Sequence, residues 1–242
     1  MRTPLFMSLL LATCVAQAMP VDRSGATYTV KTFAELGFEF DGVNSDSSPP
    51  TSLSIASASN VTGRDAADGE FATADAIADD GFLAIDTEVT GLTQPAVAVA
   101  KATFGTVLSG AGTYTLRLDF ETANDLAGGY TQAVLGFSLS VGGNTLFNEV
   151  FSSSGQIERM FELGAGEEGL LDISLGGAAV GLVSDPSATV GAYAFNLSSV
   201  GIEIDVAPVP APSAWTLMLT GLLPLLGHAR RRAARAASAD PA

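Results

Sequence analysis

The sequence predicts an all-β protein: a jelly-roll-type β-sandwich of about ten short strands, followed by a C-terminal hydrophobic helix. Three observations lead to this prediction. Apolar and polar residues alternate with a period of two through the middle of the 242-residue chain. Glycine pairs and triplets separate these alternating segments. No long amphipathic helical pattern appears between residues 19 and 206. Many short strands with glycine-rich turns are typical of sandwiches.

The clearest strand is 113–121, TYTLRLDFE, in which every second residue is apolar and the residues between are polar. The segments 134–141 and 198–206 repeat this pattern. Weaker alternation or β-branched content predicts further strands at 27–33, 52–57, 81–87, 97–105, 144–151, 157–164, 170–175 and 191–197.

Three connecting segments carry their own predictions. Gly142-Gly143-Asn144 lies between two predicted strands, which indicates a tight hairpin. The segment 42–52, GVNSDSSPPTS, is predicted to be a polar loop. The segment 64–80 is predicted to be a short helix or an acidic loop.

The N-terminus, residues 1–18, has the pattern of a secretory signal peptide. Arg2 provides a positive charge, an apolar run follows, and Ala16-Gln17-Ala18 forms a small-x-small cleavage site. Cleavage after Ala18 removes Cys14, the only cysteine, so no disulfide would form in the mature chain. Lipidation of Cys14 is the alternative for this segment.

The C-terminus divides into three parts after the predicted 19–206 ectodomain. Residues 207–213 form a proline-rich linker, residues 214–229 an apolar transmembrane-like helix, and residues 230–242 a basic tail. Sixteen helical residues span about 24 Å, slightly less than a hydrocarbon core of about 30 Å. Arginines after an apolar segment stay in the cytoplasm, so the ectodomain is predicted to lie outside. A buried core helix is the alternative.

This tail resembles the PEP-CTERM sorting signal of Gram-negative exported proteins. The matching positions are Val209, Pro210, Ala211, Pro212, Ser213, Trp215, Leu217, Gly221, Leu222, Arg230, Arg231 and Arg232, with Ala211 where the family usually has Glu. The resemblance implies export through the inner membrane, transient anchoring, and cleavage near the proline motif by an exosortase-type membrane peptidase. It also implies a final location at the cell surface or in the extracellular matrix, in bacteria that make extracellular polysaccharide.

The segment 81–125 is more weakly similar to galactose-binding-like, carbohydrate-binding-like jelly rolls. The similarity rests on Ile85, Asp86, Thr103, Phe104, Gly112, Tyr114, Thr115, Leu116 and Asp119. Most of these are core and turn positions, so the similarity implies a fold rather than a function.

Charge and composition exclude several functions. Residues 19–210 contain 25 acidic and six basic residues, a net charge of −19 that repels nucleic acid and anionic membranes. The only histidine, His228, lies in the tail. An ectodomain without His or Cys has no Ser-His-Asp or Cys-His catalysis and no His/Cys zinc or copper site. We therefore expect no enzyme, no catalytic residue and no cofactor; a carboxylate-only glycan hydrolase is the remaining catalytic alternative.

Two ligand sites are predicted within the ectodomain. A structural calcium ion, which prefers oxygen ligands, would use Asp79, Asp80 and Asp86. A sugar would stack on Tyr130, the tyrosine next to the polar loop NDLAGG. The sequence thus favours a non-catalytic, surface-sorted structural or adhesive protein associated with exopolysaccharide or biofilm matrix. The alternative is a carbohydrate-binding module with a defined glycan ligand.

Overall fold

The computed structural model describes residues 19–21, 25–37, 39–48, 56–62, 70–91, 94–181 and 192–208. Residues 17–207 form one compact unit. The predicted signal peptide, sorting motif, apolar helix and basic tail lie outside the described residues, apart from the start of the proline-rich linker at 207–208. Within the part that is described, the chain forms no helix that is long and apolar enough to cross a membrane.

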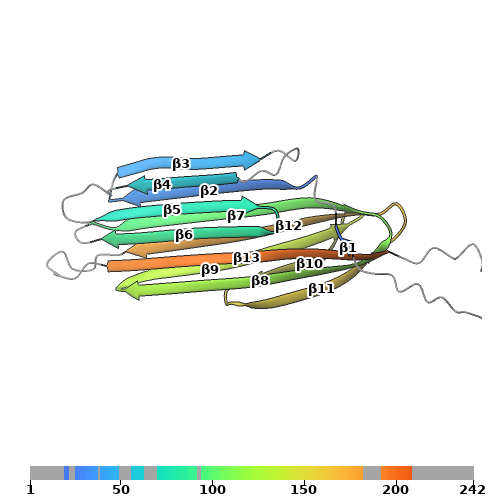
Figure 1. Ribbon diagram of the computed structural model, residues 1–242. Coiled ribbons are helices and arrows are strands. Elements are labelled where there is room, and N and C mark those ends of the chain that lie inside the picture. Colours follow the sequence, from blue (N-terminus) through green and yellow to red (C-terminus); the bar gives the residue numbers. More distant parts are fainter. Residues whose placement is uncertain are drawn as a thin grey trace, which may run out of the picture. The chain divides into compact units, whose positions relative to one another are not determined.

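The described chain is a two-layer antiparallel β-sandwich, as the sequence predicts (Figure 1). Its strands are β1 Met19–Pro20, β2 Thr27–Leu36, β3 Glu39–Ser48, β4 Ala56–Thr62, β5 Phe71–Asp79, β6 Phe82–Gly91, β7 Ala96–Ser109, β8 Gly112–Ala127, β9 Gly129–Val141, β10 Asn144–Phe151, β11 Gly155–Leu163, β12 Glu168–Gly181 and β13 Ala192–Pro208. Several are longer than the short strands expected, and β13 joins two segments that the sequence divides into separate strands.

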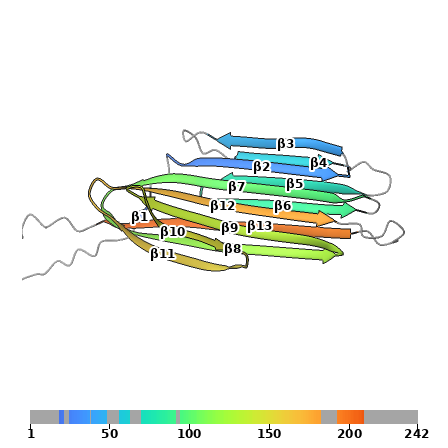
Figure 2. The same cartoon turned by 180° about the vertical axis from the view of Figure 1, so that it is seen from behind.

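The two sheets have different strand orders. The first sheet, called sheet A, runs β11-β8-β13-β6-β5-β4, with β1 added beside β13. The second, sheet B, runs β10-β9-β12-β7-β2-β3 and lies in front in Figure 2. From β6 onward the chain changes sheet at every connection except the β9–β10 hairpin, which is the crossing pattern of a jelly roll.

The hairpin predicted at Gly142-Gly143-Asn144 is confirmed. Val141 pairs with Asn144, so Gly142 and Gly143 form a two-residue loop between β9 and β10. Both glycines have positive φ, 57° and 82°. Tight hairpin turns of this kind need positive φ at both central positions, which glycine adopts without a steric cost.

Two segments predicted to be irregular are strands instead. The predicted loop 42–52 is occupied as far as Ser48 by β3, which pairs with β2. The predicted helix or acidic loop 64–80 contains β5. There Ala72, Ala74, Ala76 and Ala78 are fully buried on one face. Alanine favours helices and gives a weak hydrophobic signal, so this alternation is hard to recognise, and pairing with β4 and β6 overrides the local preference.

Alanine also sets the spacing of the two sheets at one end of the sandwich. Ala96, Ala98, Ala100 and Ala102 on β7 are buried, as are the four alanines of β5 on the opposite sheet. Cα atoms of β5 and β7 approach within 8 Å. Stacked sheets are ordinarily about 10 Å apart. Small side chains therefore allow the sheets to approach closely here, and larger ones would force them apart.

The other end of the core is filled by large side chains. Tyr114 of β8 stacks on Phe161 of β11 with ring centroids 5.3 Å apart, and Phe147 of β10 meets the edge of the same Phe161. The hydroxyl of Tyr114 donates to the carbonyl of Ser109 at 2.7 Å, so its polar atom is satisfied.

An ion pair joins the two sheets at this edge. Arg159 of β11 donates from Nε to Oε1 of Glu149 on β10 at 2.8 Å, and its Nη2 donates to Oε2 of the same carboxylate. Both side chains are about one-third exposed. A bidentate pair of this kind fixes the relative position of the two edge strands.

The close approach of the sheets predicts a strong sensitivity to side-chain volume. Ala98→Leu adds bulk between β7 and the opposite sheet and should lower the free energy of unfolding by about 1–3 kcal/mol. Val99→Leu is the matched control, because Val99 is the next residue, faces outward and is 39% exposed. It should change stability by less than about 0.5 kcal/mol. Urea denaturation of the full chain measures both; equal effects would contradict the alanine-set spacing.

Candidate functional site

A shallow trough crosses the outer face of sheet B at right angles to the strands. It has a volume of about 580 Å³ and is lined by residues of β2, β7, β12, β9 and β10. Five neighbouring strands span about 19 Å at the usual strand spacing of about 4.8 Å. The trough is therefore long enough for a short stretch of polymer.

Strand register brings two rows of small residues together to form the trough. The first row is Thr29, Thr103, Ser174, Gly136 and Val150. The second row, two residues further along the strands, is Thr27, Gly105, Asp172, Ser138 and Asn148. Outward positions two residues apart are separated by about 6.8 Å, so the rows lie side by side.

Two glycines lie on the floor of the trough, and polar side chains from neighbouring strands lean into the space above them. A Cβ atom at Gly105 would lie 3.0 Å from Oγ1 of Thr27 and 3.1 Å from Oδ1 of Asp172. A Cβ atom at Gly136 would lie 3.2 Å from Oγ of Ser174. Neighbouring polar side chains thus lean over positions that have no side chain of their own. A second hollow of about 200 Å³ continues past Thr27, Gly105 and Asp172 toward Val107 and Leu170.

The hydroxyl groups of the trough are arranged mainly as acceptors. Oγ1 of Thr27 donates to the carbonyl of Gly105 at 3.3 Å, and Oγ1 of Thr103 donates to the carbonyl of Thr29 at 3.2 Å. Ser174 donates to the carbonyl of Gly136 at 3.5 Å. The hydroxyls of Thr29 and Thr103 also hydrogen-bond to each other, which uses one lone pair. A hydroxyl that donates its proton to the sheet keeps its remaining lone pairs for an outside donor. The carboxylate of Asp172 adds further acceptors, and Lys101 supplies donors at one side.

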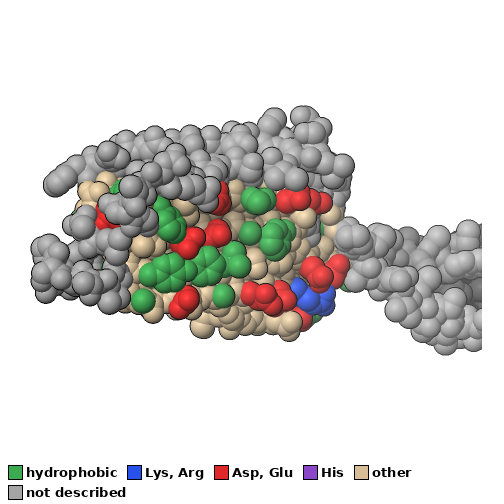
Figure 3. Space-filling model, turned by 60° about the vertical axis from the view of Figure 1, so that its left-hand side comes forward, with side chains coloured by type: hydrophobic (Ala, Val, Ile, Leu, Met, Phe, Trp, Pro, Cys, Tyr) green, Lys and Arg blue, Asp and Glu red, His purple; other side chains and the backbone are tan. Residues whose placement is uncertain are grey.

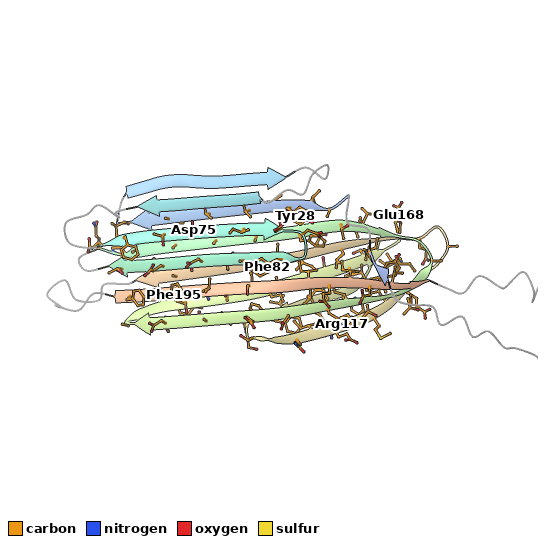
Figure 4. All side chains as sticks on the ribbon, in the orientation of Figure 1. Tyr28, Asp75, Phe82, Arg117, Glu168 and Phe195 are labelled. Carbon is orange, nitrogen blue, oxygen red and sulfur yellow. The ribbon has the colours of Figure 1, made fainter. Side chains whose placement is uncertain are left out.

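The outer face of sheet A has a different chemistry. Figure 3 shows hydrophobic side chains lying among acidic ones, with basic side chains gathered at one place. The apolar side chains are Leu197 on β13, Phe82 on β6 and Ile77 on β5, between 42% and 46% exposed, together with the less exposed Tyr193 and Phe195. Figure 4 shows Phe82, Phe195 and Asp75 on neighbouring strands of this sheet.

Carboxylates surround this apolar group. They are Asp75, Asp79, Asp86, Glu88, Asp119, Glu121, Asp125, Glu158, Glu162, Glu203 and Asp205, which alternate with the core positions of their strands. Arg117 binds two of them, Glu158 at 3.0 Å and Asp205 at 2.8 Å. Burial, followed by the charges of Glu88 and Asp125, raises the pKa of Tyr193. The negative charge of the described chain is thus concentrated on sheet A.

Asp86 is the carboxyl group whose surroundings disfavour its charge most clearly. It lies directly opposite Asp75 across β6 and β5. Its Oδ1 is buried and has no hydrogen-bond partner among the described residues. Burial, followed by the charges of Asp75 and Glu88, raises the pKa of Asp86 above its ordinary value of 3.8.

The structure does not bring the three predicted calcium ligands together. Asp79 and Asp80 lie at the tip of the β5–β6 hairpin, whereas Asp86 lies four residues beyond Phe82, the pairing partner of Asp79, which is about 14 Å along β6 at the usual rise per residue. Oδ1 of Asp79 accepts from the backbone N–H of Asp80 at 2.6 Å, and Oδ1 of Asp80 accepts from the hydroxyl of Tyr28 at 3.3 Å. No group of three or more metal-ligating side chains occurs among the residues that the structure describes.

Tyr130 lies at the start of β9 and is 54% exposed. Its hydroxyl donates to Oε1 of Gln132 at 3.1 Å. The ring is therefore accessible, as a stacking residue must be, but it is not among the residues that line the trough. The predicted signal-cleavage residues Ala16 and Ala18 and the predicted sorting residues 209–232 lie outside the described residues.

Sequence reasoning missed the trough. The residues that form it are short polar side chains and glycines from five strands, and no single segment carries a motif. The available signal was weak: Thr27, Thr29, Thr103, Gly105, Ser138 and Ser174 all occupy outward positions where alternation predicts only a solvated face.

Comparison with known proteins adds no family. No family model and no curated protein matches the chain. A solved structure described as "CBM4 structure and function" is 12% identical and has a TM-score of 0.25, covering 62% of this chain and 86% of the other. A glycoside hydrolase family 31 α-xylosidase from Xanthomonas citri is 6% identical, with a TM-score of 0.18, covering 80% of this chain and 38% of its own. An infectious bursal disease virus structure is 10% identical, with a TM-score of 0.18, covering 77% and 68%.

The raised pKa of Asp86 predicts a pH-dependent stability. Between the unfolded and folded pKa values the folded chain binds more protons, so stability falls as pH rises through this window and remains reduced above it. Asp86→Asn removes the charge and should raise the free energy of unfolding at pH 7 by about 0.2–1 kcal/mol. The gain should vanish near pH 3, where the native carboxyl is protonated.

Asp119→Asn is the control for this prediction, because Asp119 is an exposed outward residue of β8 on the same face. Thermal unfolding of both variants across the acid range measures the difference. Identical pH profiles for the two variants would contradict the assignment of a strained charge to Asp86.

Proposed function

We propose that this protein is a non-catalytic β-sandwich that contacts extracellular polysaccharide through the trough of sheet B, as a structural or adhesive component of a surface matrix. The observation that carries the proposal is the trough itself, a hollow of about 580 Å³ across five strands that is lined in part by hydroxyl, amide and carboxylate side chains. Polysaccharides present rows of hydroxyl donors, and the trough presents rows of oxygen acceptors.

The lining also suggests how strongly a glycan would be held. Phe104 and Phe137 contribute to it, but their rings are 1% and 2% exposed and belong to the core. Without an exposed aromatic ring in the trough, binding rests on hydrogen bonds, each of which contributes modestly in water. Weak contacts repeated along a polymer by many copies of the protein add up through avidity. This favours a matrix component over a module with one tightly bound glycan.

The arrangement of carboxylates supports a non-catalytic role. Glycoside hydrolysis generally needs two carboxyl groups, one of them kept protonated. Asp172 and Glu149 are both lining residues, but the carboxylate of Glu149 is directed to Arg159 of the opposite sheet. Hydrogen bonds from Arg159 lower the pKa of Glu149, so Glu149 is held as an anion and is unsuited to act as the acid.

Export and sorting form the second part of the proposal. The chain would cross the inner membrane, be anchored briefly by the tail, and be released by an exosortase-type peptidase to the surface of a Gram-negative bacterium. The strand pairing is compatible with both cuts. Met19 pairs with Val206 and Pro20 with Asp205, so β1 and the end of β13 lie side by side. Cleavage after Ala18 and near residues 209–212 would leave every described strand in the product.

Filling the trough tests the binding proposal. Ser138→Phe places a ring over the trough and should abolish retention on immobilised polysaccharides that bind the native full chain. Ser199→Phe is the matched control, because it adds the same ring to the outward face of β13 in sheet A. Retention on none of a broad panel of glycans, or equal retention of both variants, would overturn the proposal.

Processing can be tested separately. Mass spectrometry of the surface-associated protein from a host with an exosortase should find Met19 at its N-terminus and no peptide beyond the proline motif. Recovery of an intact 230–242 peptide from the cell surface would contradict the sorting proposal and leave the binding proposal unaffected.

A further inference from the structure

Two lysines lie directly opposite each other on the outer face of sheet B. Lys31 of β2 and Lys101 of β7 are register partners, and both side chains are exposed. Like charges opposite each other across two strands destabilise a sheet. Such a pair is unexpected in a protein with 26 acidic residues, where an opposite charge could stand in either position.

The described arginines behave differently. Arg117 pairs with Glu158 and Asp205, and Arg159 pairs with Glu149. Among the residues whose side chains the structure describes, neither Lys31 nor Lys101 forms an ion pair. The described carboxylates at outward positions of this face are those of Glu35, Glu168 and Asp172, and neither lysine forms an ion pair with them.

The lysine pair lies at one side of the trough. Lys101 belongs to the lining, and the row Thr29–Thr103–Ser174 comes next. Asp172 lies in the following row, about 13 Å from Lys101 at the usual strand rise. Across the trough the surface thus changes from cationic, through neutral hydroxyls, to a carboxylate.

We infer that the trough binds an acidic polysaccharide of low charge density, with a sugar carboxylate held between Lys31 and Lys101. Neutral sugar residues would occupy the hydroxyl rows and donate hydroxyls to Asp172. This inference rests on the proposed function and names the class of glycan. An ammonium group offers three donors, and its hydrogen bonds to a carboxylate are shorter and stronger than those between neutral groups.

The carboxylate of Asp172 at the far side of the trough is the reason to expect a polysaccharide of low charge density. A polymer with a charge on every residue would place an anion against Asp172 as well as against the lysines. Nucleic acid has such a density, and its binding requires several cations along its track. A chain in which charged and neutral residues alternate can place a charged residue beside the lysines and a neutral residue beside Asp172, at the two sides of the trough.

The test compares three probes with the native full chain: hyaluronan oligosaccharides, in which uronate alternates with a neutral sugar; polygalacturonate, charged on every residue; and neutral dextran oligosaccharides. Hyaluronan should bind most tightly, and its affinity should fall when NaCl rises from about 0.05 to about 0.5 M, because salt screens exposed charges. Lys31→Gln with Lys101→Gln should weaken hyaluronan binding by about tenfold or more and weaken dextran binding much less, because glutamine keeps a hydrogen-bond donor and loses only the charge.

Two controls isolate the site. Lys31→Arg with Lys101→Arg keeps both charges and should retain most of the affinity. Arg117→Gln removes a positive charge from sheet A and should have no effect on hyaluronan binding.

The remaining outcomes distinguish the inference from the proposed function. Native affinity in the double Gln variant, or equal binding of dextran and hyaluronan, overturns the inference; the proposed function stands if Ser138→Phe still abolishes binding. Tighter binding of polygalacturonate overturns the low charge density. Failure of every glycan to bind overturns both the inference and the proposed function.

Discussion

The whole sandwich depends on two strands from the end of the described chain, β12 and β13, which occupy interior positions in the two sheets. β12 lies between β9 and β7, and β13 lies between β8 and β6. Neither sheet is continuous until these strands have paired with partners far away in sequence. Such long-range pairing is slow because the entropy of closing large loops is lost before the contacts form. The trough shares this dependence, since Asp172 and Ser174 of β12 complete both of its rows.

The core is packed with small side chains at one end and with large side chains at the other. Around β5 and β7, alanines on both sheets allow close approach, whereas Tyr114, Phe147 and Phe161 fill a wider space between β8, β10 and β11. The bidentate pair of Arg159 and Glu149 joins the sheets at the edge of the wider end. A sandwich whose thickness varies in this way has one side chain volume that suits each position, so its inner faces tolerate little exchange between small and large residues.

Much of the fold could be predicted from the sequence because most strands show a local alternation of apolar and polar residues. The predicted segment 113–121 lies within β8, and the two glycines at 142–143 form the expected hairpin. Strand β5 was not predicted, because alanine favours helices and its alternation gives only a weak hydrophobic signal. The trough could not be predicted for a different reason. Thr27, Gly105 and Asp172 are neighbours only because of the register of three strands, and no local sequence pattern encodes that register. The predicted calcium ligands failed to meet for the same reason, since positions along one strand separate steadily.

The division of charge between the sheets changes what the net charge of −15 implies. Carboxylates gather on the outer face of sheet A, whereas Lys31 and Lys101 lie on the outer face of sheet B. The two outer faces are separated by about 10 Å of core plus two layers of side chains. At physiological salt the Debye length is about 8 Å, so charges on one outer face are largely screened at the other. Among the described side chains, a ligand approaching sheet B therefore meets mainly the local field of the two lysines, Glu35, Glu168 and Asp172. Net charge describes the solubility of the whole chain, and the choice of ligand is made by the few charges beside the trough.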